Sequence, residues 1–174
     1  MSDLHVIDVD WPAPDQVRAC VTTRRGGVSR GPYAGLNLAR HVEDDPRAVE
    51  ANRRRLRQEL GLPAEPVWLD QVHGVQIIDA ARHGSSKQAD AAFTESKNIV
   101  CSVLTADCLP VLICNRQGSK VAAAHAGWRG LQAGIIEQTV RALQEPAADL
   151  LVWLGPAIGP AAFEVGDEVK LAFE

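Results

Sequence analysis

The chain has 174 residues, of which 46% are hydrophobic and 23% are charged, enough for one globular domain with a core but cramped for two. Its formal net charge of -4 gives it no general attraction to nucleic acid or to an anionic membrane surface. The N-terminus does not resemble a secretory signal, and no apolar run is long enough to span a membrane. We therefore expect a cytoplasmic protein, without nucleic-acid or membrane partners, whose four cysteines are not joined in disulfides.

The N-terminal third of the sequence predicts one strand and one helix. Val17 to Arg24 favours a strand, and Asp44-Asp45-Pro46 is typical of a helix start, with an N-cap carboxylate and a proline in the first turn. The helix should run to about Leu60 and end at Gly61. Arg53 falls on the apolar face of this helix, so it either lies at the edge of the core or reaches an anionic ligand.

The rest of the chain is richer in predicted strands than in helices. Strands are expected at Pro66 to Gly74, Val75 to Asp79, Ile99 to Leu104, Leu109 to Cys114, Lys120 to Ala126 and Leu150 to Leu154. A helix should follow Gly127 with Leu131, Ile135, Thr139 and Leu143 at helical spacing, and a short helix should start at Asp167. The order is not a regular strand–helix alternation, which predicts an α+β fold with a mixed β-sheet core and outer helices. We expect residues 1–174 to form a single domain, truncated at its C-terminus because the last helical pattern has no cap.

Three residues next to predicted strand ends form a candidate metal site. His73, Cys108 and His125 offer two imidazoles and one thiolate, a donor set that suits a borderline-soft divalent metal. Three protein ligands leave one coordination position open, as in catalytic zinc sites. The spacing matches no zinc-finger pattern, so the alternative that each histidine is only a hydrogen-bonded structural residue stays open.

The neighbours of these residues suggest further roles. Asp107 could orient a ligand or act as an acid or base, although it could equally cap a turn. Arg129 and the backbone near Gly130, at a predicted helix start, could bind phosphate or another anion. The glycines Gly127 and Gly130 could instead only turn the chain.

The longest motifs resemble those of a known bacterial family. VWLDQVHG, TADCLPVLICN, AAAHAGWRGL and WLGPAIGPAAFEVG, together with TTRRGGVS, LNLARHVEDD and Asn52-Arg53, are similar to the YfiH-type family, whose members have been described as laccase-domain or multi-copper polyphenol oxidase-like proteins. Members are now often described as purine nucleoside phosphorylases with adenosine deaminase and methylthioadenosine phosphorylase activity. The resemblance implies a zinc site at His73, Cys108 and His125 and makes Arg53 a candidate for substrate or phosphate contact. It also implies an α+β fold related to Cys–His hydrolase-like proteins.

Three functions follow as hypotheses. The first is a zinc-dependent purine nucleoside enzyme that performs phosphorolysis of adenosine, inosine and methylthioadenosine and deamination of adenosine. The second is a copper-dependent, laccase-like polyphenol oxidase, which five histidines and the single methionine, Met1, make a poor match. The third is a hydrolase, such as one that edits cell-wall precursors, with Cys108 as nucleophile, a histidine as base and Asp107 as the orienting group. Preferred nucleoside and oligomeric state are not predicted.

Overall fold

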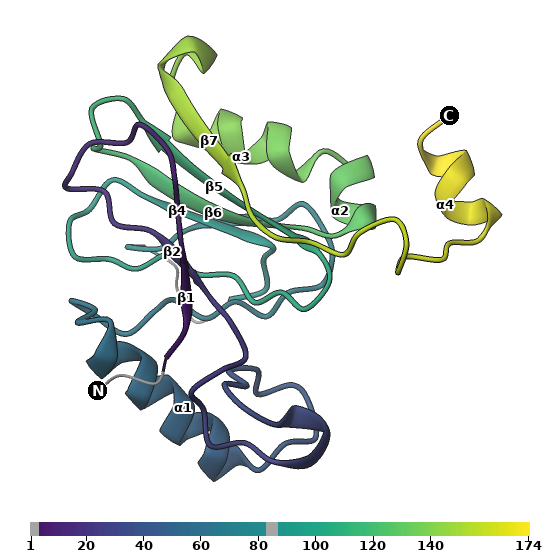
Figure 1. The fold of residues 1–174 in the computed structure, drawn as a ribbon. Helices are drawn as coiled ribbons and strands as arrows, with labels where there is room; N and C mark the ends of the chain where they lie inside the picture. The colour runs from purple at the N-terminus through teal and green to yellow at the C-terminus, as the bar shows by residue number, and fades with distance from the viewer. Residues whose placement is uncertain (1–3, 83–86) are drawn as a thin grey trace. The chain divides into compact units, whose positions relative to one another are not determined.

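A computed structural model describes residues 4–82 and 87–174, and it divides the chain into two compact units (Figure 1). The first unit comprises Met1–Asp10 and Arg18–Glu65, and the second comprises Trp11–Val17 and Pro66–Glu174. The predicted helix and the predicted metal ligands therefore fall in different units, which we describe separately.

The first unit contains a two-stranded sheet and the longest helix. β1 (Val6–Asp8) pairs antiparallel with β2 (Cys20–Thr22), a short 3-10 turn covers Gly31–Tyr33, and α1 spans Pro46–Glu59. The predicted caps of α1 are confirmed, since the side chain of Asp45 accepts a hydrogen bond from the Arg47 backbone N–H and Gly61 adopts a φ of 57°. β2 is shorter than the predicted strand.

A buried asparagine on α1 fixes the loop that precedes the helix. Asn52 is fully buried, and its Oδ1 accepts from the Val28 N–H at 2.8 Å. Its Nδ2 donates to Ser29 Oγ at 2.9 Å and to the carbonyls of Gly35 and Asn37 at 3.2 and 2.9 Å. One amide thus satisfies four groups of a loop that would otherwise need water.

The second unit is built on a five-stranded mixed sheet. Its strands are β3 (Ile77–Asp79), β4 (Ala91–Thr94), β5 (Leu109–Asn115), β6 (Val121–Ala126) and β7 (Leu150–Leu154), in the spatial order β3-β4-β6-β5-β7. β3 and β4 are parallel, and all other pairs are antiparallel. The helices are α2 (Trp128–Gln132), α3 (Ile135–Leu143) and α4 (Asp167–Ala172), and a 3-10 turn covers Ala147–Asp149. This is the predicted α+β fold with a mixed sheet.

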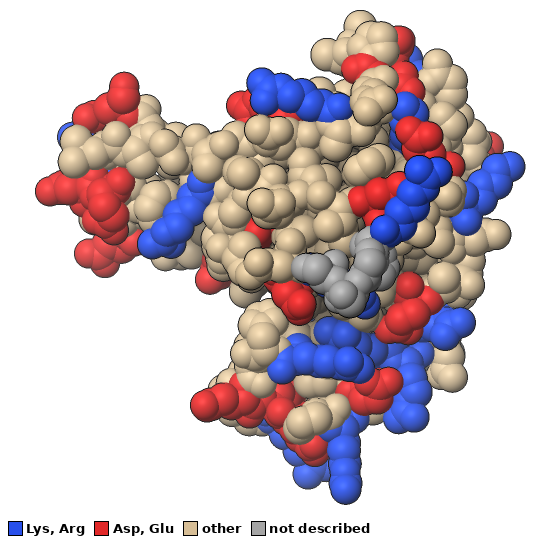
Figure 2. All heavy atoms as spheres, turned by 180° about the vertical axis from the view of Figure 1, so that it is seen from behind, with Lys and Arg blue, Asp and Glu red and all other residues tan. Residues whose placement is uncertain are grey.

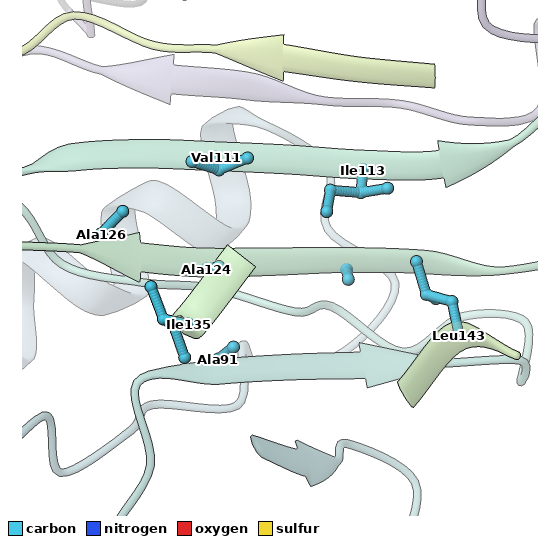
Figure 3. Close-up of a cluster of buried hydrophobic side chains, with 8 residues drawn as sticks. Ala91, Val111, Ile113, Ala124, Ala126, Ile135 and Leu143 are labelled. Atoms are coloured by element: carbon cyan, nitrogen blue, oxygen red, sulfur yellow. The ribbon is translucent and has the colours of Figure 1, made fainter. Parts of the chain in front are cut away.

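One core cluster of this unit lies between the sheet and α3, and a second one includes Val67, Leu69 and Ala92. Small residues on β4 and β6 leave room for the helix to approach, and Ile135 and Leu143 of α3 are fully buried against them (Figure 3). Val111 and Ile113 of β5 complete the cluster.

Several predicted elements differ from the observed ones. Residues 66–74 and 99–104 were predicted as strands but make only isolated bridges, Val67 to Cys101 and Asp70 to Gln88. The predicted helix after Gly127 is two helices, α2 and α3, because Gly134 adopts a left-handed φ of 92° between them. β1 and β4 were not predicted. β5, β6, β7 and α4 lie where the sequence predicted them.

The surface shows no single dominant charge. Exposed arginines of α1, Arg47, Arg54 and Arg57, belong to a unit that also carries exposed acids, and Figure 2 shows basic and acidic side chains interspersed over one face. Among the described residues, none of the helices has both the length and the apolar character needed to cross a bilayer.

Candidate metal centre

The structure brings the three predicted metal ligands together. The candidate ligand atoms of His73, Cys108 and His125 all lie within 4.8 Å of one another, and no other group of this kind occurs in residues 4–82 and 87–174. The two imidazole rings meet edge to face, with centroids 4.7 Å apart and planes at 78°. His125 is buried, Cys108 is half-buried and His73 is exposed, so the cluster opens to solvent on one side.

The antiparallel pairing of β5 and β6 explains why Cys108 and His125 meet. Pro110 of β5 pairs with His125 of β6, and Leu109 pairs with Ala126. Cys108 immediately precedes β5, so it lies at the edge of the sheet where β6 ends. A shift of register by one residue would turn His125 to the other face of the sheet.

His73 is held in a conformation that few residues adopt. Its φ of 58° is in the left-handed region, which is unfavourable for a residue with a Cβ. The carboxylate of Asp90 accepts three consecutive backbone N–H groups there, from Val72 at 3.2 Å, His73 at 2.9 Å and Gly74 at 2.7 Å. These charge-assisted bonds stabilise the turn that presents the His73 ring.

The same carboxylate orients the second histidine. Asp90 Oδ1 lies 2.9 Å from Nδ1 of His125, and the backbone N–H of His125 donates to the Asp90 carbonyl at 2.7 Å. Asp90 is fully buried and His125 is 3% exposed. A carboxylate only accepts hydrogen bonds, so Nδ1 carries a proton, and in the neutral imidazole Nε2 is left with its lone pair.

A glutamine ties the two ligand loops to each other. Gln71 Nε2 donates to the Leu104 carbonyl at 2.8 Å, and Gln71 Oε1 accepts from the Leu104 N–H at 2.7 Å. The segment that carries His73 is therefore bonded to the segment that leads to Cys108. This side-chain amide occupies the place of a backbone partner, which is one reason that neither segment forms a regular strand.

Gly127 closes the inner side of the cluster. A Cβ atom at this position would lie 2.8 Å from Cδ2 of His73, 3.0 Å from Sγ of Cys108 and 3.7 Å from Cε1 of His125. Its φ of -67° is ordinary, so the backbone conformation does not require glycine here. The space taken by the His73 and Cys108 side chains favours it, because a Cβ would lie closer to both than an ordinary contact.

The environment of Cys108 disfavours its thiolate unless a cation is near. Burial raises the pKa of the Cys108 thiol, and the carboxylates of Asp107 and Asp90 raise it further. A metal ion would supply the opposite charge that the thiolate needs. The donor set, the convergence of the three side chains and the carboxylate behind His125 all fit a metal ion, without distinguishing zinc from copper.

The other predicted residues of this unit lie beside the cluster. Asp107 is exposed, and its carbonyl accepts a hydrogen bond from Ile158 at 2.9 Å, which attaches the loop after β7. Arg129 is exposed and stacks on Trp128, with 4.2 Å from its Cζ to the ring centroid. Gly130 is buried, and a Cβ there would lie 3.0 Å from the Gly74 carbonyl. Their roles in catalysis or phosphate binding stay predictions.

Arg53 belongs to the other unit. It is 5% exposed, and both its Nε and Nη2 donate to the Leu38 carbonyl, at 2.8 and 2.6 Å. Burial lowers the pKa of its guanidinium to about 10. The predicted inward orientation is confirmed, and the predicted contact with substrate or phosphate stays a prediction.

Sequence reasoning missed Asp90 and Gln71. Asp90 was detectable in principle, because it is a lone acid among Ala89, Ala91 and Ala92, and a buried acid needs a partner. Gln71 gives no such signal, since its role depends on the position of Leu104.

Comparison with known proteins identifies related chains. The sequence model of a family described as multi-copper polyphenol oxidoreductase laccase matches residues 18–174. The chain is 60% identical to a purine nucleoside phosphorylase of Pseudomonas aeruginosa, over 94% of this chain and 66% of that protein. It is 55% identical to the purine nucleoside phosphorylase YfiH of Escherichia coli, over 94% of this chain and 68% of that protein.

Solved structures agree with these matches. A crystal structure of a Neisseria meningitidis protein superposes with a TM-score of 0.91 at 47% identity, over 97% of this chain and 69% of that one. YlmD from Geobacillus stearothermophilus gives 0.84 at 31% identity, over 99% of this chain and 71% of that one. The chain spans about two thirds of the length of the curated relatives described above.

Proposed function

The chain belongs to the multi-copper polyphenol oxidoreductase laccase family, as its YfiH-type motifs indicated, and we propose that it provides the metal centre of a zinc-dependent purine nucleoside enzyme. The reactions proposed are phosphorolysis of adenosine, inosine and methylthioadenosine, and deamination of adenosine. Relatives named purine nucleoside phosphorylase support the substrate class. The observation that carries the proposal is the convergence of His73, Cys108 and His125 over Gly127.

In this proposal His73, Cys108 and His125 hold the zinc ion. When bound, zinc supplies a Lewis acid that ionises water near neutral pH and polarises a substrate atom. Asp90 keeps the His125 ring in the tautomer that a metal requires. The exposed side of the cluster, at His73, is where a nucleoside would approach.

Phosphorolysis requires an anion site as well as a nucleoside site. A phosphate oxygen forms a bond to C1′ of the ribose while the bond from C1′ to the purine nitrogen breaks, and the base leaves with a proton. Arg129 is our candidate for holding phosphate within this unit, since it is exposed and follows Gly127 closely in sequence. Asp107 is the candidate acid for the leaving base.

Deamination uses water in place of phosphate. A water oxygen adds to C6 of the purine, and ammonia leaves from the same carbon. Asp107, next to Cys108 and exposed, is the candidate proton carrier between water and ammonia. The two reactions therefore differ in their nucleophile and in their need for an anion site.

A hydrolase that uses Cys108 as nucleophile is the second candidate. The observation in its favour is the bond between His125 and Asp90, which gives a Cys–His–Asp arrangement. Asp90 takes the orienting role that the sequence assigned to Asp107. The proposal of a metal centre is preferred because it accounts for His73 as well.

One preparation, purified without added copper, tests these proposals. Metal is measured by elemental analysis, and adenosine, inosine and methylthioadenosine are each incubated with and without phosphate before products are separated. About one zinc per chain, with free base released only when phosphate is present, supports the phosphorylase. Inosine formed from adenosine without phosphate supports the deaminase. Copper with phenol oxidation, or a metal-free chain that hydrolyses acyl substrates, would overturn the zinc proposal in favour of an alternative.

A further inference from the structure

Four hydrogen bonds converge on one buried side chain that is not itself a candidate ligand. Asp90 Oδ1 is shared by the His73 N–H and His125 Nδ1, and Oδ2 accepts from the Val72 and Gly74 N–H groups. The carboxylate is fully buried, so water does not compete for these donors. We propose that Asp90 is the positioning residue of the metal centre, which sets both the backbone of the His73 turn and the tautomer of His125. This inference rests on the proposed metal centre and not on the nucleoside chemistry.

The place of Asp90 in the chain suits this double role. It directly precedes β4, and its backbone is bonded on both sides, with its N–H donating to the Gln76 carbonyl at 2.9 Å and its carbonyl accepting from His125 at 2.7 Å. The start of β4 holds the carboxylate, and the carboxylate in turn holds the His73 turn, which lies outside the strands, and the ring of His125 on β6. Two of the three candidate ligands therefore depend on one anchored group.

The His73 arm depends on the three N–H groups together. A left-handed φ at His73 costs energy that the surrounding contacts must offset. The three successive N–H groups that donate to the Asp90 carboxylate offset this cost, and they can do so only while both carboxylate oxygens accept. Removal of the carboxylate would leave these donors unpaired and would let the turn relax to an ordinary φ, which moves the ring.

The orientation of His125 depends on the direction of one hydrogen bond, from its Nδ1 to Asp90. With Asp90 as acceptor, Nδ1 carries the proton and Nε2 keeps its lone pair. An asparagine at position 90 has one acceptor and one donor end. If its oxygen faces the Val72 and Gly74 donors, its NH2 faces both the His73 N–H and Nδ1 of His125. The His73 donor is then opposed by another donor, and Nδ1 must give its proton to Nε2, which costs the lone pair that a metal needs.

The alternative orientation of asparagine is no better. If its oxygen faces Nδ1, its NH2 points at the Val72 and Gly74 N–H groups, and two donors oppose each other. Asp90→Asn therefore disturbs at least one arm in either orientation, with almost no change of side-chain volume. The variant separates the hydrogen-bonding role of Asp90 from its space-filling role.

The test uses zinc alone, without nucleoside. Zinc affinity of the wild type, Asp90→Asn and Asp90→Glu is measured by competition with a chromophoric chelator. We expect both variants to bind about 10- to 100-fold more weakly, the range found when partners of metal-ligating histidines are removed. The matched control is Asp79→Asn on β3, which makes the same change of charge at a side chain that accepts from the Ala81 N–H and pairs with Arg82. The control should keep wild-type affinity.

A second readout follows the tautomer directly. With 15N-labelled histidine, NMR of the metal-free wild type should show His125 protonated at Nδ1, and Asp90→Asn should move that proton to Nε2 or broaden the His73 turn amides. A wild type protonated at Nε2 would overturn the proposal even if the variant does not fold. So would a folded Asp90→Asn that binds zinc as tightly as the wild type. If the wild type showed the expected zinc affinities and tautomer but did not turn over nucleosides, the proposed function would be wrong. The role of Asp90 would still be supported.

Discussion

A Cβ atom on Gly127 would lie 3.0 Å from Sγ of Cys108, closer than side chains ordinarily pack. The backbone at Gly127 is extended and unstrained, so this contact and the 2.8 Å approach to Cδ2 of His73, and not a special φ, favour glycine here. The absence of one methyl group thus gives the three candidate ligands room to converge.

Gly127→Ala should therefore weaken zinc binding by about 10-fold or more, because the new methyl group displaces the His73 ring or the Cys108 thiol from the cluster. Titration with a competing chelator measures the effect. Gly159→Ala is the control, since a Cβ there meets no heavy atom within 4 Å. Equal affinities for the two variants would show that the contact is not limiting.

Replacing His73, Cys108 or His125 by alanine should abolish zinc uptake or weaken it sharply, because two remaining ligands cannot hold the ion well. Elemental analysis of the purified variants gives the metal content. His41→Ala and Cys20→Ala, both at exposed positions, are matched controls that should keep one zinc per chain. If all three ligand variants retained stoichiometric zinc, the three-residue centre would be wrong.

Gln71→Ala should lower the free energy of unfolding by about 1–3 kcal/mol, since it removes two hydrogen bonds to Leu104 and leaves a partly buried N–H and carbonyl without them. Urea denaturation measures the loss. Gln76→Ala, at an exposed side chain, should change stability by less than about 0.5 kcal/mol. Zinc affinity should also fall in the first variant, because the His73 and Cys108 segments lose this connection between them.

Cys101 should resist alkylation at pH 8, because burial, reinforced by the charge of Asp79, raises its pKa to about 12. Since this pKa lies about four units above the pH, about one thiol in 10,000 is ionised, and the fraction rises about tenfold per pH unit up to the pKa. Mass spectrometry after brief iodoacetamide treatment, at pH 8 and 9, follows each cysteine. Labelling of Cys101 as fast as the exposed Cys20 would contradict the burial of its thiol.

The strands with continuous apolar runs were predictable, and those stabilised by tertiary contacts were not. β5 and β6 are buried and carry their signal in their own residues. β4 is only four residues long and begins with Ala91 and Ala92, which have no strand preference of their own. Residues 66–74 and 99–104 have a strand pattern, but the Gln71 side chain takes one of their backbone partners.

The candidate site was predictable in its ligands but not in its supports. Two imidazoles and a thiolate beside strand ends indicate a candidate metal site by their donor chemistry. The role of Asp90 depends on the pairing of β4 with β6. The role of Gly127 depends on the side chains of His73 and Cys108 that lie next to it. Such roles come from tertiary distances, which residue types do not encode.

The spacing of the three ligands along the chain has a consequence for chain entropy. Cys108 and His125 are 17 residues apart, and the hairpin of β5 and β6 already holds them together, whereas His73 is 35 residues from Cys108. Closing a flexible loop of twice the length costs about 0.6 kcal/mol more. A bound ion thus acts as a crosslink, and more chain entropy is lost in closing the loop from His73 to Cys108 than the loop from Cys108 to His125. Without an ion, the bonds of Gln71 to Leu104 already close nearly the same loop, and the bonds of His73 and Gly74 to Asp90 close a shorter loop within it.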